Sequence, residues 1–240
     1  MGHFRFMLCG EGEYRFHNGK ERPAYPSCLV GPTFGPTRFS ARGNVRLCGA
    51  VVFPAGWASL TGRLGAELAD DILPAESLFG PTVQECWTAL SEADTDAEQI
   101  RILDDYLVEL FSKAPEPPFW FTSIVEEWLT SSTSPQVEEL VAATGLSARQ
   151  VERHSNRIYG GPPKLVARKH RALKAAAEVA RHRASWHQIA QDSFFDQSHF
   201  IREFKRFVGV TPTQLLEDPS PFARLLLRHD PYFDRLGETL

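Results

Sequence analysis

A proline-rich segment at residues 113–118, Lys-Ala-Pro-Glu-Pro-Pro, constrains the fold of this chain more than any other feature of the sequence. Proline lacks the N–H group that a helix needs and clashes with the preceding turn, so no helix continues through this segment. The spacing of apolar residues also differs on its two sides. We therefore expect a domain of residues 1–112, a linker of residues 113–118, and a second domain that begins at residue 119.

The N-terminal side is expected to be rich in β-strands as far as about residue 60. Short apolar runs, such as Phe4 to Leu8 and Val51 to Phe53, alternate with clusters of glycine and proline. Runs of this length between turn residues are typical of strands. They predict a small β-rich domain, either cupin-like or a sandwich.

Helical spacing begins near residue 75. One helix is expected from about residue 79 and another over residues 95–112, in which Ile100, Leu103, Leu107 and Leu110 recur every three or four positions. Such a stripe needs to be covered, either by its own domain or by a second copy of the chain. The spacing favours neither, so a homodimer through this helix stays open.

Almost everything after the linker has helical spacing. Residues 119–129 form an amphipathic helix, and residues 134–144 form a second one, with Ser134 as its cap, Pro135 in its first turn and Gly145 as its stop. A third helix then begins at Ser147, another good N-cap. Two helices joined by a short turn that contains glycine predict a helix-turn-helix unit.

The same design recurs further along the chain. Ser185 and Asp196 can cap two further helices, and Phe200, Phe204 and Phe207 form the core face of the second one. A long helix over residues 162–183 connects the two units. Some 20 residues span about 30 Å, close to the ~34 Å of one DNA turn. The expected fold class is therefore α+β, with an all-α C-terminal domain of two helix-turn-helix units joined by a long helix.

The distribution of charge fits this division. The net charge of the whole chain is −4. Residues 1–118 hold 10 Lys and Arg against 16 Asp and Glu, a net charge of −6, whereas residues 147–218 hold 13 against 7, a net charge of +6. A local positive field attracts phosphate groups even when the whole protein is negative.

In a helix-turn-helix unit the second helix enters the major groove, so recognition helices are expected near residues 147–159 and 196–208. In the first, the polar residues between the core positions Val151 and Ile158 include arginine, glutamine, serine and His154. Arginine can pair with guanine, glutamine with adenine, and serine with phosphate or a base edge. The expected DNA-facing residues are Ser147, Arg149, Gln150, Arg153 and Arg157 in the first unit, and Gln197, Ser198, His199, Arg202 and Lys205 in the second.

The motif Phe195-Asp-Gln-Ser-His-Phe-Ile-Arg-Glu-Phe-Lys-Arg-Phe-Val-Gly-Val-Thr-Pro resembles the signature of the AraC/XylS family of bacterial transcription regulators. Leu140-Val-Ala-Ala-Thr-Gly-Leu-Ser is similar to the first helix-turn-helix unit of that family, and Tyr159-Gly-Gly-Pro-Pro-Lys to the start of its linker helix. The resemblance covers residues 119–218 and leaves 219–240 as a C-terminal tail. It implies sequence-specific binding of double-stranded DNA at promoters or operators, with the ten residues above facing the DNA.

One position departs from the family pattern. The family usually has glycine at the turn of the second unit, where this chain has Ser193-Phe-Phe. Serine adopts positive φ less readily than glycine, so the second unit can be oriented differently on DNA, and whether it reads bases stays open.

The N-terminal domain more weakly resembles the small β-rich domain that precedes this DNA-binding region in many bacterial regulators. That resemblance implies dimerisation or binding of a small-molecule effector. RNA polymerase is an expected partner if the protein is an activator. Neither the effector, the operator nor the direction of regulation follows from the sequence.

Two alternatives remain. One is a metal-dependent β-barrel enzyme fused to a helical domain, although only His3 and His17 precede residue 119 and neither belongs to a metal-binding spacing. The other is a non-catalytic module that binds proteins through its helical half. No catalytic residues, metal or cofactor are expected, and the four cysteines are interpreted as small buried hydrophobes. With no apolar run of membrane-spanning length and no signal peptide, a cytoplasmic protein is expected.

Overall fold

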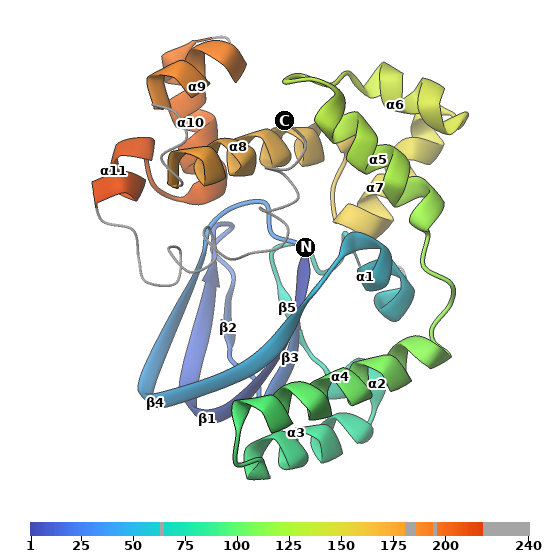
Figure 1. Ribbon diagram of the computed structural model, residues 1–240, viewed down its shortest axis with the longest axis vertical. Helices are drawn as coiled ribbons and strands as arrows, with labels where there is room; N and C mark the ends of the chain where they lie inside the picture. Colours follow the sequence, from blue (N-terminus) through green and yellow to red (C-terminus); the bar gives the residue numbers. More distant parts are fainter. Residues whose placement is uncertain (63–64, 181–185, 194–195, 218–240) are drawn as a thin grey trace. The chain divides into compact units, whose positions relative to one another are not determined.

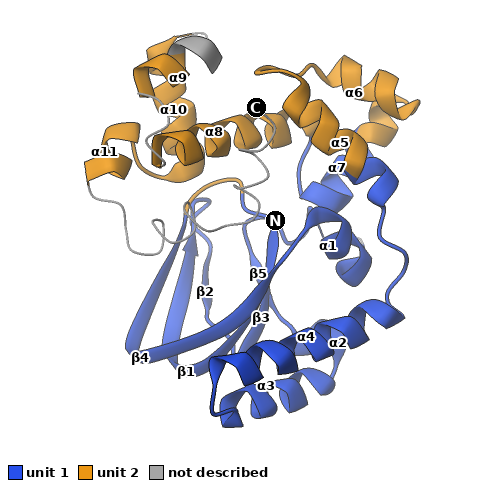
Figure 2. Cartoon of the chain, in the orientation of Figure 1, with its two compact units in different colours: residues 1–33, 37–122, 152–162 blue, residues 34–36, 123–151, 163–240 orange. Residues whose placement is uncertain are grey.

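The computed structural model describes residues 1–62, 65–180, 186–193 and 196–217 (Figure 1). The chain forms two compact units. Unit 1 consists of residues 1–33, 37–122 and 152–162, and unit 2 of residues 34–36, 123–151 and 163–240 (Figure 2). Residues 114–118 join α4 (Asp96–Lys113) to α5 (Phe119–Ser131), so Lys113 of the expected linker 113–118 is the last residue of α4. The change of unit at residues 122–123 falls inside α5.

The β-rich part of unit 1 is one antiparallel sheet with five strands, so the described residues do not form the two stacked sheets of a sandwich. The long strands β1 (Gly2–Phe16) and β4 (Thr37–Val52) pair along almost their whole length. The other edge of β1 pairs first with β3 (Ser27–Val30) and then with β2 (Glu21–Pro23), and β5 (Ile72–Pro74) adds to β3.

Two register shifts interrupt the pairing of β1 with β4, between Met7 and Cys9 and between Cys9 and Glu11. Gly10 lies within the second shift at φ +91°, and a Cβ there would approach the Asn44 carbonyl oxygen to 2.7 Å. Glycine is the residue that tolerates this geometry. The shifts change the alternation of faces, so residues on the two sides of the bulges enter different cores.

The larger core of unit 1 lies between the sheet and the helices. Before the bulges, β1 contributes Phe4, Phe6 and Leu8 to this core, which also holds Trp57. After the bulges, β1 contributes Tyr14 and Phe16 to a smaller cluster with residues of β3 and β5. The helices that contribute to the larger core are α1 (Pro54–Thr61), α2 (Glu76–Phe79), α3 (Thr82–Glu92) and α4.

The structure corrects one expectation about these helices and answers one question that the sequence left open. Residues 54–61, expected as part of the strand region, form α1, because Pro54 suits the first turn of a helix and Trp57 is then buried to 1% exposure. On α4, Leu103, Leu107 and Leu110 pack against the core of their own unit, whereas Ile100 is 66% exposed. The stripe is therefore mostly intramolecular. Thr95 caps this helix by accepting a hydrogen bond from the Glu98 N–H.

The described residues of the C-terminal part form helices and the turns between them, as expected. After α5 come α6 (Val137–Thr144), α7 (Ala148–Tyr159), α8 (Pro163–Ala180), α9 (Trp186–Ser193), α10 (Gln197–Val208) and α11 (Pro212–Glu217). α8 is the long connecting helix of Figure 1, and its 18 residues span about 27 Å. Alanines of α8 pack with residues of α9, α10 and α11 in the main core of unit 2.

The helix ends mostly follow the sequence signals. Gly145 and Gly209 adopt positive φ at the ends of α6 and α10, and Asp196 caps α10 by accepting from the His199 N–H at 2.7 Å. The cap of α6 is Gln136 and not Ser134. The predicted cap Ser185, the turn residues 194–195 and the tail after residue 217 lie outside the described residues. Among those that are described, no helix combines the length and apolarity needed to cross a bilayer.

Candidate nucleic-acid interface

The predicted DNA-facing residues of the first unit lie along one exposed side of α7. Arg149, Gln150, Arg153 and Arg157 are all exposed, and Ser147 is exposed just before the helix. The opposite side is buried and consists of Val151, Ser155 and Ile158. This side is held partly by a hydrogen bond from the Ser155 hydroxyl to the Gly161 carbonyl at 2.6 Å. The helix therefore presents a basic polar face to solvent because its apolar positions recur at helical spacing.

Two of these five residues also have structural roles. The Gln150 Oε1 atom accepts hydrogen bonds from the Ser147 N–H at 2.9 Å and from the Ser147 hydroxyl at 2.8 Å. The Gln150 N–H in turn donates to the Ser147 hydroxyl at 3.4 Å, which completes a capping box. A bidentate pair with adenine needs the glutamine oxygen as an acceptor, so in this arrangement Gln150 has only its amide N–H donors to offer a base.

Arg157 is the second such residue. Its Nε atom donates to the carbonyl of Gly62 at 3.2 Å, a contact within unit 1. Gly65 also approaches the backbone of α7 closely, since a Cβ at Gly65 would lie 2.0 Å from the Arg157 carbonyl oxygen.

His154 packs against α5. The rings of Trp120 and Phe121 lie against its ring, at centroid distances of 5.6 and 5.2 Å. His154, which the sequence grouped with the polar face, is thus half-buried against α5, and burial lowers its pKa, with smaller contributions from Arg153 and Arg157.

In the second recognition helix, α10, most of the predicted DNA-facing residues take no part in capping or in side-chain hydrogen bonds. Gln197, Ser198, Arg202 and Lys205 are exposed, and within the described part of the chain their side chains form no hydrogen bond. Asp196, which precedes the helix, supplies the cap instead. Phe200, Phe204 and Phe207 are buried on the inner side. His199 is half-buried and lines a cavity beside α8, so the structure places it apart from the other four.

A buried ion pair that the sequence did not reveal joins α10 to α8. Arg168 donates to both carboxylate oxygens of Glu203, at 2.8 and 2.7 Å, and Glu203 is only 6% exposed. The hydrogen bond from Arg168 lowers the pKa of Glu203 and raises the pKa of Arg168. The bidentate geometry fixes the orientation of α10 on its supporting helix. The sequence gives Glu203 only as one of the acidic residues of the basic region 147–218, because it does not show which residue faces it.

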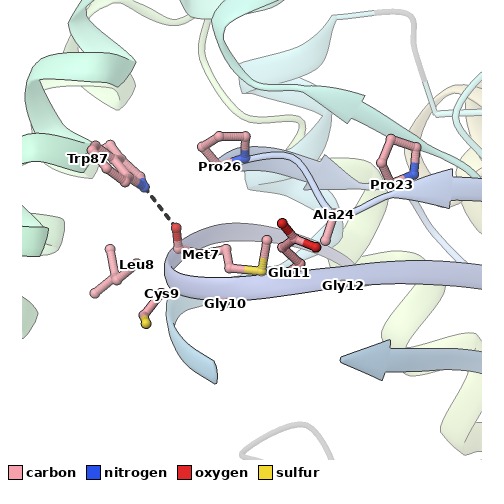
Figure 3. Close-up of a pocket in the computed structure, with 10 residues that line it drawn as sticks. All are labelled: Met7, Leu8, Cys9, Gly10, Glu11, Gly12, Pro23, Ala24, Pro26 and Trp87. Atoms are coloured by element: carbon pink, nitrogen blue, oxygen red, sulfur yellow. Dashed lines mark hydrogen bonds between the residues drawn. The ribbon is translucent and has the colours of Figure 1, made fainter. Parts of the chain in front are cut away.

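Unit 1 has a pocket of about 560 Å³ beside the β1 bulges (Figure 3). Met7, Leu8, Pro26 and Trp87 form part of its wall, and the Trp87 Nε1–H donates to the Met7 carbonyl at 2.8 Å.

The cysteines only partly match the prediction that all four are buried. Cys9 lines the pocket and is exposed. Cys28 and Cys86 do fit that expectation, and burial raises the pKa of their thiols to about 11 and about 12. Among the described residues, no group of three or more His, Cys, Asp or Glu side chains is placed to hold a metal ion.

Comparison with known proteins finds one family model that matches part of this chain and solved structures with a similar fold. A family model for a helix-turn-helix domain matches residues 140–218, from α6 to the end of α11. The fold is similar to that of ToxT from Vibrio cholerae, with 13% sequence identity, a TM-score of 0.52, and coverage of 92% of this chain and 90% of that chain. A ToxT variant in its apo form, from another strain of Vibrio cholerae, gives 14% identity, a TM-score of 0.51 and coverage of 90% and 88%. Comparison with curated proteins gives no match.

Proposed function

We propose that this chain is a DNA-binding transcription regulator of the AraC type, and that it reads operator sequences through α7 and α10. The match of residues 140–218 to a helix-turn-helix family model supports this proposal. The observation that carries this proposal is the pair of capped helices with exposed polar faces. Each places arginine beside glutamine and serine, in a region with a net charge of +6. Arginine and glutamine discriminate bases in the major groove, whereas the surrounding positive charge binds phosphate.

The test is genome-wide mapping of the binding sites of the full chain, followed by fluorescence anisotropy with the recovered operator and with random duplex DNA of the same length. We expect tighter binding to the operator and an affinity that falls steeply with salt. Equal affinity for the two duplexes would refute sequence-specific reading. No detectable DNA binding at any salt concentration would favour the protein-interaction alternative. Stoichiometric metal in the purified protein would favour the enzyme alternative.

The proposal includes control by a small-molecule effector bound to the N-terminal domain, residues 1–112. The pocket beside the β1 bulges supports it, because about 560 Å³ lies in the size range of ligand sites and the wall is largely apolar. A library of small molecules can be screened for changes in operator affinity. The substitution Ala24→Phe, which fills part of the pocket, should abolish the response to any hit that binds there. A hit that acts equally on this variant would place the effector elsewhere.

Further parts of the proposal concern partners and location. Ile100 and Val108, which are 66% and 61% exposed on α4, are the apolar residues that this helix offers to a second copy of the chain. A homodimer is therefore proposed, and light scattering that gives a monomer at micromolar concentration would remove it. The regulator is proposed to act in the cytoplasm, with RNA polymerase as a partner if it activates transcription.

A further inference from the structure

Residues 65–71 form a turn segment that packs closely against the C-terminal end of α7. A Cβ at Gly65 would lie 2.0 Å from the Arg157 carbonyl oxygen and 2.9 Å from that of Asn156, so a larger residue cannot be accommodated without movement. A Cβ at Gly160, just after the helix, would lie 3.0 Å from the Gly65 carbonyl oxygen. All of these residues belong to unit 1. The segment therefore touches the backbone of a recognition helix directly.

The same segment is tied to the end of β1, to β2 and to the turn between these strands. Asp71 accepts hydrogen bonds from Lys20 at 2.8 Å and from Arg22 at 3.0 and 3.1 Å. Asp70 pairs with His17 at 3.0 Å. The side chains of the two aspartates are only 13% and 10% exposed, whereas their three partners are more exposed. Charge-assisted hydrogen bonds thus anchor the segment to the sheet.

The backbone of the segment is held in an uncommon conformation. Asp70 has a φ of +52° and is the one non-glycine residue with positive φ in the described part of the chain. Its N–H donates to the Pro32 carbonyl at 2.9 Å, and the Gly31 N–H donates to the Asp71 carbonyl at 3.0 Å. Such a backbone persists only where its surroundings hold it. Loss of the tie to Lys20 and Arg22 should therefore let the segment move away from α7.

The chain just before this segment reaches the polar face of α7. The Arg157 Nε atom, on a predicted DNA-facing residue, donates to the Gly62 carbonyl at 3.2 Å. An α-helix with its side chains is about 10–12 Å across and the major groove is about 12 Å wide, so the groove admits the helix alone. Backbone that lies against Arg157 therefore occupies space that DNA needs at this end of the helix.

We propose that residues 65–71 form an autoinhibitory clamp on α7, and that release of this clamp increases the affinity of the protein for DNA. The proposal rests on the proposed function, because it takes the polar face of α7 as the surface that enters the groove. The clamp is closed in this structure. It opens when the tie between Asp71 and its two cationic partners is lost, and the population of the open form sets the apparent affinity.

The test measures binding of the full chain to a duplex of mixed sequence by fluorescence anisotropy. Arg22→Gln weakens the tie and should strengthen binding by about two- to fivefold, the range of a partly exposed ion pair. Gly65→Ala puts a methyl group against the Arg157 carbonyl and should strengthen binding further. Unchanged or weaker binding by both variants, at wild-type melting temperature, would show that the segment does not inhibit α7 and would overturn the proposal.

Arg15→Gln is the matched control. Arg15 lies near the end of β1 and pairs with Glu21 at 2.6 Å, where both side chains are more than half exposed. The substitution removes the same charge as Arg22→Gln but leaves the tie to Asp71 intact. Loss of a positive charge alone does not favour DNA binding, so this variant should bind no more tightly than the wild type. Equal strengthening by Arg15→Gln and Arg22→Gln would overturn a clamp that is released through Asp71.

A second measurement tests the clamp without DNA. Amide hydrogen exchange of the full chain should be faster over residues 65–71 and 152–159 in Arg22→Gln and Gly65→Ala than in the wild type and Arg15→Gln. Unchanged exchange in α7, with normal DNA binding by the wild type, would overturn the clamp and leave the proposed function standing. Faster exchange in α7, with no DNA binding by any of these proteins, would overturn the proposed function and the inhibition with it.

Discussion

The two recognition helices have the same length and a similar polar face, but they are held in place differently. α10 is anchored by three buried phenylalanines and the Arg168–Glu203 pair, and the residue that caps it, Asp196, lies outside its polar face. α7 has smaller buried residues, and both its cap and its contact with Gly62 use residues of the polar face itself. The polar face of a recognition helix is thus fully available to bind DNA only if residues outside that face hold the helix in place.

The largest expected effect is on the anchor of α10. Glu203→Gln leaves Arg168 without its counter-charge in a place where 32% of that side chain is exposed, so we expect a loss of about 3 kcal/mol in the free energy of unfolding. Chemical denaturation of the full chain measures it. The matched control is Glu152→Gln on the exposed face of α7, which should change stability by less than about 0.5 kcal/mol. Similar losses for both would contradict the unequal anchoring of the helices.

The next effect concerns pH. Burial, with a smaller contribution from Lys174, lowers the pKa of His170 in α8 to about 4. The unfolded chain, with a histidine pKa of about 6.5, then binds more protons than the folded chain between these two values. Stability is therefore complete above about pH 6.5 and falls by about 2 to 3 kcal/mol as the pH approaches 4.

Urea denaturation of the full chain across this pH range measures the effect. His170→Gln cannot titrate, so it should flatten the pH dependence over the window. A wild-type slope that persists in this variant would assign the dependence to other groups.

A smaller effect is expected on DNA reading. Arg202→Ala and Arg149→Ala should each weaken binding to the mapped operator more than to random duplex DNA, by about 1 to 3 kcal/mol of discrimination. The comparison of the two helices predicts the larger loss for Arg202, because α10 is the more firmly anchored. Anisotropy titrations on both duplexes measure the difference. Equal losses on operator and random DNA would show that these arginines contact phosphate and not bases.

The smallest effect separates capping from reading in α7. Gln150→Ala removes the side-chain acceptor of the capping box and should cost about 1 kcal/mol of stability. Gln150→Glu keeps that acceptor and should retain the stability, while it loses the amide donors that can reach a base. A loss of operator specificity in Gln150→Glu with normal stability would show that Gln150 reads bases despite its role in the cap.

The sequence predicted α3 to α10, their order and most of their ends, because these follow from local periodicity and capping residues. It did not predict the short helices α1, α2 and α11. Ser147, Asp196 and Gly145 act at the positions expected. The sequence predicted the wrong cap for α6, where two possible helix starts lie close together. Ser134 followed by Pro135 is a good helix start, but Gln136 with Glu139 forms a reciprocal box two residues later.

The site was predicted less completely than the fold. The exposed positions of α7 and α10 follow from helical spacing, and nine of the ten predicted DNA-facing residues are exposed. Their hydrogen bonds do not follow from spacing. The partner of Arg157 lies 95 positions away and that of Arg168 lies 35 positions away, and only the folded chain shows such pairs.

The bulges of β1 restrict how the length of this strand can change. Phe6 and Tyr14 lie on one continuous strand but belong to different cores, and the bulges set which residues face each core. An insertion of one residue between Leu8 and Gly12 that the bulges do not absorb would reverse the faces on one side, and would turn either Phe4 and Phe6 or Tyr14 and Phe16 towards solvent. We therefore expect the segment to accept substitutions that fit its backbone, and a one-residue insertion to destabilise one of the two cores.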